Sequence, residues 1–213
     1  MRQSAVSFQV KGLTFEGVMV QPDGQPAALP GVVICHPHPL YGGNMDNNVV
    51  RSVSFALAEY GFATLRFNFR GVGNSQGEHT KGESEHHEVL GALDLMKAWP
   101  GVDGHRIGLA GYSFGTSVIL RHSDLQKRAK AIALISPALQ ALESTALKGS
   151  KRPILVIAGD EDKLVQSEQL GAVLDTFSSP PTCHVVTGAD HYWFGYEGQL
   201  APQVVEFFAK KLK

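Results

Sequence analysis

Short apolar runs alternate with helical patterns along most of this chain. The runs are residues 31–35, 63–67, 107–110, 131–135 and 154–158. Runs that are apolar almost throughout are typical of strands buried on both faces, which occur in parallel sheets. Apolar residues at helical spacing separate or follow the runs, at 49–60, 89–96, 170–177 and 200–212. The alternation predicts a doubly wound α/β sheet with right-handed crossovers and helices on both faces.

The first twenty residues follow a different pattern. Residues 6–10 and 13–20 alternate apolar and polar side chains and are joined at Lys11-Gly12. Alternation interrupted by a short turn predicts a hairpin at an edge of the sheet. A further strand is expected at 184–186. With 213 residues, the chain is long enough for a substantial core, and we expect one domain over 1–213.

Composition excludes several classes of partner. A net charge of −1 gives no electrostatic basis for binding nucleic acid or an anionic membrane. No apolar stretch approaches the roughly 20 residues of a membrane span, and residues 1–7 lack the apolar run of a secretory signal. Cys35 and Cys183 lie far apart in predicted strands, so we expect buried free thiols and a reducing, cytoplasmic location.

The segment Gly111-Tyr112-Ser113-Phe114-Gly115 joins a predicted strand to a predicted helix. This arrangement predicts a nucleophile elbow, a sharp turn that exposes a serine hydroxyl above the sheet. Strand and helix crowd together at such a turn, so side chains two positions either side of the serine would clash. The backbone N–H of Phe114 would remain free at the helix start, where it can face a developing negative charge.

An acid and a histidine follow in the order expected for an elbow-type hydrolase. The run 154–158 leads into Asp160 and Asp162, and the last strand leads into Asp190 and His191. Because functional residues collect at the carboxyl ends of the strands, Ser113 and these side chains should meet at one edge. Asp160 and Asp162 both qualify by position as the acid. Asp190 adjoins His191 and is expected to be a loop residue.

The chain resembles the α/β-hydrolase superfamily over nearly its whole length. It is similar to small bacterial serine hydrolases without a lid that carry a His-Pro-His-Pro segment after the third strand. The matching segments are 36–43, 66–77, the elbow, 159–165 and 188–191. The resemblance implies a sheet of about eight mostly parallel strands and an enzyme without a cofactor.

The resemblance also implies individual roles. Its Gly-x-x-Asp-x-x-Val pattern places the acid at Asp162, leaving Asp160 as a turn residue. A second oxyanion donor should come from the loop after Cys35. Prolines at 37 and 39 have no N–H, so His38 is the first choice and Leu40 the second.

Other motifs predict less. His36 and His38 could form half of a metal site, but no carboxylate or cysteine at ligand spacing accompanies them, and we expect no metal. Residues 83–88 read as a polar, solvated helix start. A serine in place of a cysteine nucleophile argues against dienelactone-hydrolase chemistry. Residues 136–151 leave room for one short helix, so we expect no large cap over a shallow, uncovered site.

The predicted function is that of a carboxylesterase-like serine hydrolase. Ser113, Asp162 and His191 would form a catalytic triad, with Phe114 and His38 as backbone oxyanion donors, and would cleave small carboxylic esters or thioesters through an acyl-enzyme. Peptidases and amidases use the same triad, and a ligand-binding or regulatory protein of low turnover could share the fold. These alternatives stay open on the sequence, as does the oligomeric state.

Overall fold

The computed structural model describes residues 1–24, 28–165 and 167–213. Its framework is an eight-stranded sheet in the order β1-β2-β4-β3-β5-β6-β7-β8. The strands are β1 (Arg2–Val10), β2 (Leu13–Gln21), β3 (Leu29–Cys35), β4 (Ala63–Phe67), β5 (Val102–Tyr112), β6 (Ala131–Ile135), β7 (Ile154–Gly159) and β8 (Thr182–Val186). The pairs β1–β2 and β2–β4 are antiparallel, and every other pair is parallel. The predicted α/β sheet is confirmed.

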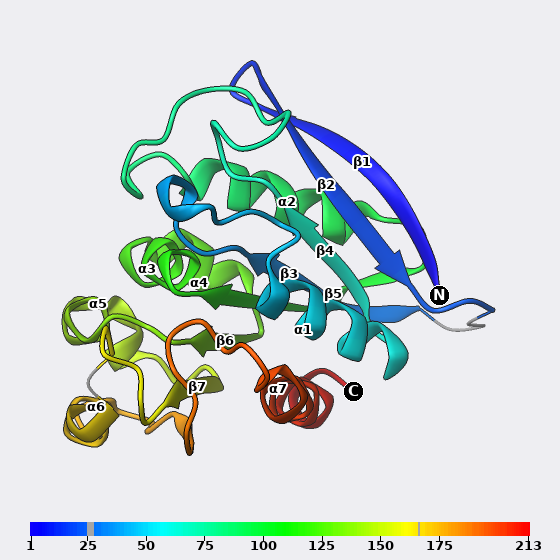
Figure 1. The fold of residues 1–213 in the computed structure, drawn as a ribbon. Coiled ribbons are helices and arrows are strands. Elements are labelled where there is room, and N and C mark those ends of the chain that lie inside the picture. The colour runs from blue at the N-terminus through cyan, green and yellow to red at the C-terminus, as the bar shows by residue number, and fades with distance from the viewer. Residues whose placement is uncertain (25–27, 166) are drawn as a thin grey trace.

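The amino-terminal hairpin forms where the alternation predicted it. Val10 pairs with Leu13 across a two-residue turn. Lys11 and Gly12 both have positive φ angles, 50° and 81°, which matches the twist of the flanking strands. The hairpin extends the parallel part of the sheet at one edge (Figure 1).

Helices cover both faces of the sheet (Figure 1). They are α1 (Asn48–Glu59), α2 (His86–Ala98), α3 (Phe114–Arg121), α4 (Ser123–Arg128), α5 (Leu139–Ser144), α6 (Ser167–Leu174) and α7 (Glu197–Leu212), with single 3₁₀ turns at Pro39–Tyr41 and Ala146–Gly149. Helices α1 and α7 pack on one face, while α2 to α6 supply the apolar residues of the other. In the part of the chain that the structure describes, no helix is long and apolar enough to cross a membrane.

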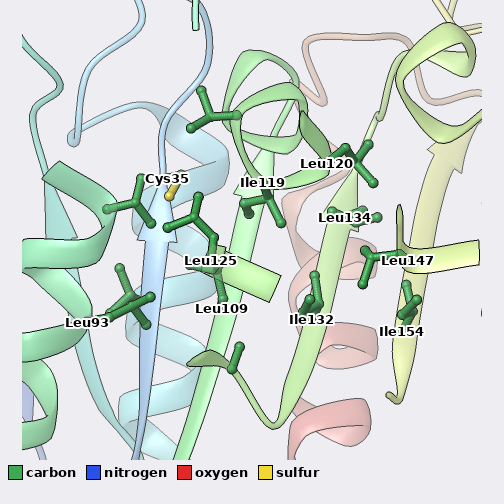
Figure 2. Close-up of a cluster of buried hydrophobic side chains, with 14 of the residues drawn as sticks. Cys35, Leu93, Leu109, Ile119, Leu120, Leu125, Ile132, Leu134, Leu147 and Ile154 are labelled. Atoms are coloured by element: carbon green, nitrogen blue, oxygen red, sulfur yellow. The ribbon is translucent and has the colours of Figure 1, made fainter. Parts of the chain in front are cut away.

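Two apolar cores lie on opposite faces of the sheet, and successive strand residues alternate between them. In β6, Ile132 and Leu134 belong to the core under α2 to α6, and Ala133 and Ile135 to the core under α1 and α7. Figure 2 shows the first of these cores, where side chains of β3, β5, β6 and β7 meet those of the helices. Burial on both faces explains why the parallel strands read as continuous apolar runs.

The space between β6 and β7 holds only α5 and one 3₁₀ turn, so no cap domain is inserted there.

Two expectations from the sequence are wrong, one about Cys183 and one about the start of α2. Cys35 is buried, but Cys183 is exposed because β8 is the edge strand and leaves four of its five residues open to solvent. The start of α2 is not simply solvated either. Glu85 and Glu88 are fully buried there, where Glu88 pairs with Arg70 at 2.8 Å.

Candidate active site

Ser113 occupies a strained turn between β5 and α3. Its φ and ψ are 53° and −112°, a conformation that costs a non-glycine residue about 1–3 kcal/mol. A Cβ added to Gly111 would lie 2.8 Å from the backbone of Gly115, and one added to Gly115 would lie 2.5 Å from the carbonyl oxygen of Cys35. Both glycines are therefore required by the close packing of β3, β5 and α3.

The structure brings Ser113, His191 and Asp162 together in one chain of hydrogen bonds. Ser113 Oγ lies 2.9 Å from His191 Nε2, and His191 Nδ1 lies 2.8 Å from Asp162 Oδ2. The three residues come from the loops that follow β5, β8 and β7. This is the geometry that a hydroxyl nucleophile, a base and an orienting acid require.

Asp162 is a buried carboxylate with several donors. Its side chain is fully covered, and Oδ1 accepts the N–H groups of Leu164 at 2.9 Å and Val165 at 3.0 Å. Burial raises the pKa of this carboxyl, but the hydrogen bond and charge of His191, with hydrogen bonds from Ser136 and Leu164, outweigh it and hold the pKa below its ordinary value. The group is thus an anion suited to fix an imidazole.

The two other aspartates shape loops and do not face the imidazole. Asp160 Oδ1 accepts the N–H of Gly188 at 2.7 Å. Asp190 Oδ1 accepts the N–H groups of Tyr192 at 2.9 Å and Trp193 at 3.1 Å. Asp190 thus forms a turn within the loop that carries His191. Asp160 is not the turn residue that was expected, because it links the loop after β7 to Gly188, which lies 28 residues further along the chain.

Three supporting residues were missed by the sequence analysis. Tyr112 donates its hydroxyl proton to the carbonyl oxygen of His191 at 2.5 Å. Trp193, fully buried, donates its indole N–H to Ser136 Oγ at 3.1 Å, and Ser136 is one of the groups that lower the pKa of Asp162. Tyr112 lies within the elbow motif, so its position near the site could have been predicted. No pattern in the sequence indicates that Ser136 and Trp193 contact each other.

His36 fastens the loop after β3. Its Nε2 accepts the N–H of Phe69 at 3.0 Å, so Nδ1 carries the proton of the neutral ring and donates to the carbonyl oxygen of Pro37 at 2.7 Å. Burial, opposed by the bond to Pro37, lowers the pKa of His36 to about 4. A neutral, fully buried imidazole thus ties this loop to the loop after β4.

His38 caps the 3₁₀ turn that follows it. Its Nδ1 accepts the N–H of Leu40 at 3.2 Å, so the second-choice oxyanion donor is already engaged. Within the described residues, the backbone N–H groups of His38 and Phe114 donate to no protein acceptor. Both residues border the same open cleft as Ser113 and His191.

The cleft above Ser113 has a volume of about 850 Å³. Its walls come from the loops after the six strands from β3 to β8, so it lies at the carboxyl edge of the parallel sheet. Ligand sites of α/β sheets lie at this edge. Clefts of this size bind small molecules.

The sequence matches the model of the "Dienelactone hydrolase family" over residues 15–199. The chain belongs to this family. An uncharacterized protein of Rickettsia prowazekii (strain Madrid E) is 30% identical over 173 residues, which cover 77% of this chain and 72% of the relative.

Solved structures with the same fold cover nearly all of the chain. An α/β serine hydrolase homologue from Coxiella burnetii is 32% identical with a TM-score of 0.84 and covers 97% of each chain. A Xanthomonas campestris protein described as an α/β serine hydrolase without lid is 25% identical with a TM-score of 0.84, covering 100% of this chain and 96% of the other. The chain is thus a small α/β hydrolase without a lid.

Family membership qualifies one earlier argument. The serine at the elbow separated this chain from dienelactone-hydrolase chemistry, yet the family model spans most of the sequence. The match covers residues 15–199 as a whole, whereas the kind of nucleophile depends on the single residue at position 113, a serine. The family name therefore does not assign a dienelactone as substrate.

The crowding at the elbow predicts opposite effects for two glycine substitutions in helices. Alanine is favoured over glycine inside a helix by about 1 kcal/mol. Gly171→Ala in α6, where a Cβ meets nothing within 4 Å, should raise the free energy of unfolding by up to that amount. Gly115→Ala should lower it by about 1–3 kcal/mol, since the new Cβ would press on backbone. Urea unfolding of both variants measures this, and a stabilised Gly115→Ala protein would contradict the described elbow.

Proposed function

We propose that the protein is a serine hydrolase that cleaves small-molecule carboxylic esters or thioesters through an acyl-enzyme. The observation that carries the proposal is the hydrogen-bonded chain from Ser113 Oγ through His191 to the buried Asp162. Its place in a cleft at the carboxyl edge of the sheet supports the proposal, and so does membership of a hydrolase family. No metal or cofactor is needed for this chemistry.

Acylation begins when Ser113 Oγ attacks the substrate carbonyl carbon and His191 Nε2 takes the hydroxyl proton. The carbonyl oxygen becomes an oxyanion, and the imidazolium that forms is stabilised by the carboxylate of Asp162. When the intermediate collapses, His191 gives the proton to the leaving alcohol or thiol. Water then attacks the acyl-enzyme by the same route, with His191 again as base, and releases the acid.

The oxyanion would be held by the N–H groups of Phe114 and His38. Both are free of protein acceptors in the described part of the chain, whereas the N–H of Leu40 is bound to the ring of His38. This difference favours His38 over Leu40. His36 would act as a positioning residue, because it holds the carbonyl of Pro37 and so fixes the direction of the peptide N–H at His38.

A fluorophosphonate probe should label the wild-type protein and fail to label Ser113→Ala. Ser117→Ala is a matched control because Ser117 borders the same cleft but, among the described residues, takes no part in the hydrogen bonds of His191 and Asp162. This control should be labelled at the wild-type rate, which intact-protein mass spectrometry would measure. Equal labelling of Ser113→Ala would contradict Ser113 as the nucleophile. No labelling of the folded wild type would support the ligand-binding alternative instead.

The two candidate acids should differ in their effect on turnover. Asp162→Asn should lower kcat/KM for p-nitrophenyl acetate by roughly 10²–10⁴-fold, because the amide cannot stabilise the imidazolium or hold its tautomer. Asp160→Asn keeps an oxygen that can accept from Gly188 and should stay within about threefold of wild type. Steady-state kinetics on both variants decide the matter. A larger loss in Asp160→Asn would reverse the assignment, and comparable rates on p-nitroanilides would indicate an amidase.

A further inference from the structure

Exposed apolar side chains gather at the mouth of the cleft. Among the described residues, Leu40, Tyr41, Leu164 and Tyr192 are large, apolar and mostly exposed, with 86% of Tyr41 open to solvent, and all four border the cleft. Phe194, which is 71% exposed, stacks on Tyr192 with ring centroids 6.5 Å apart. We call these five residues the apolar rim. Apolar patches of this kind mark binding surfaces, because covering them removes apolar area from water.

The rim is held in place by its own loops. The N–H of Tyr41 bonds the carbonyl oxygen of His38 at 3.1 Å, and its ring lies 4.7 Å from the ring of His38. The N–H of Tyr192 bonds Asp190 at 2.9 Å. The loop backbone at both tyrosines is thus already ordered, so a ligand that covers the two rings has only their side chains to immobilise.

The proposed chemistry assigns a side of the scissile bond to each half of the rim. The leaving oxygen must lie within reach of His191 Nε2, and the ring of Tyr192 packs edge-on against that of His191 at 5.9 Å. The carbonyl oxygen would face the N–H of His38, whose ring lies 4.7 Å from that of Tyr41 and 4.9 Å from that of Phe114. Tyr192 thus lies on the side of the leaving group, which leaves the part of the cleft beside Leu40 and Tyr41 for the acyl portion.

We propose that Tyr192 with Phe194 binds the alcohol portion of the substrate, and that Leu40 with Tyr41 binds the acyl portion. The substrate class is then a monomeric ester or thioester that is apolar on both sides of the scissile bond. This inference rests on the proposed function of Ser113. It departs from the expectation of a shallow site for small esters, because a cleft of about 850 Å³ with an aromatic rim offers far more contact than such esters use.

The test is a set of four esters: methyl acetate, methyl hexanoate, 1-naphthyl acetate and 1-naphthyl hexanoate, each kept below its aggregation concentration. Comparing each variant with wild type on the same ester cancels the intrinsic reactivity of the leaving group. Tyr192→Ser should lower kcat/KM on both naphthyl esters about fivefold, mainly through KM, and change both methyl esters less than twofold. Tyr41→Ser should lower both hexanoates about fivefold and spare the acetates. Tyr192→Leu should restore most of the loss of Tyr192→Ser.

Tyr60→Ser is the matched control, because Tyr60 is 53% exposed but lies at the end of α1 and does not border the cleft. This variant should leave kcat/KM unchanged on all four esters. Uniform losses on all four esters in the Tyr41 or Tyr192 variants, or no losses, would overturn the assignment. Wild-type turnover that appears only above the aggregation concentration would assign the rim to a lipid surface and would overturn it as well.

A binding measurement separates this inference from the proposed function. Ser113→Ala should bind 1-naphthyl hexanoate without hydrolysing it, and adding Tyr192→Ser should weaken the Kd about fivefold by calorimetry. Hydrolysis by Ser113→Ala would refute the role of Ser113. The role of the apolar rim would then be decided by the difference in Kd between Ser113→Ala and the double variant that also carries Tyr192→Ser. Equal affinities in the two proteins would refute the rim and leave the hydrolase assignment intact.

Discussion

The close approach of β3, β5 and α3 at the elbow is the constraint on which the rest of the site depends. Ser113 has a positive φ because the chain must reverse between Tyr112 and Phe114. The reversal is possible only because positions 111 and 115 carry no Cβ. It sets the serine hydroxyl beside the cleft and starts α3 at Phe114, whose N–H donates to no acceptor among the described residues. About 1–3 kcal/mol of backbone strain is tolerated here because two apolar cores hold the flanking elements rigid.

The other groups of the site are fixed to this point by hydrogen bonds between loops. Asp162 binds the imidazole ring of His191, and the hydroxyl of Tyr112 binds the backbone carbonyl oxygen of His191. His36 joins the loop after β3 to the loop after β4. The links of Asp162 to His191 and of His36 to Phe69 join loops of neighbouring strands, whereas Tyr112 reaches His191 across two intervening strands. The parallel strands end at the same edge of the sheet, which brings all of these loops within reach of one another. The site is preorganised in this sense, with little left to order when a substrate binds.

Much of the architecture could be predicted because local physics fixes it. Strands β6 and β7 are buried on both faces, so their sequences are continuous apolar runs from which the strands could be predicted. The elbow is crowded and requires glycine at positions 111 and 115, so the turn could be predicted from those glycines. The side chains that meet across loops could not be read in this way. The partnership of Trp193 with Ser136 depends on tertiary packing between residues with no periodic relation. The exposure of Cys183 depends on its strand being at the edge, which no pattern within that strand reveals.

The central claim is that Ser113, His191 and two backbone N–H groups converge on one reacting carbonyl. A crystal structure of the protein after reaction with a small alkyl fluorophosphonate tests it most directly. We expect phosphorus bonded to Ser113 Oγ and a phosphoryl oxygen within hydrogen-bonding distance, about 3 Å, of the N–H groups of both Phe114 and His38. An adduct on any other residue, or a phosphoryl oxygen directed away from both donors, would contradict it.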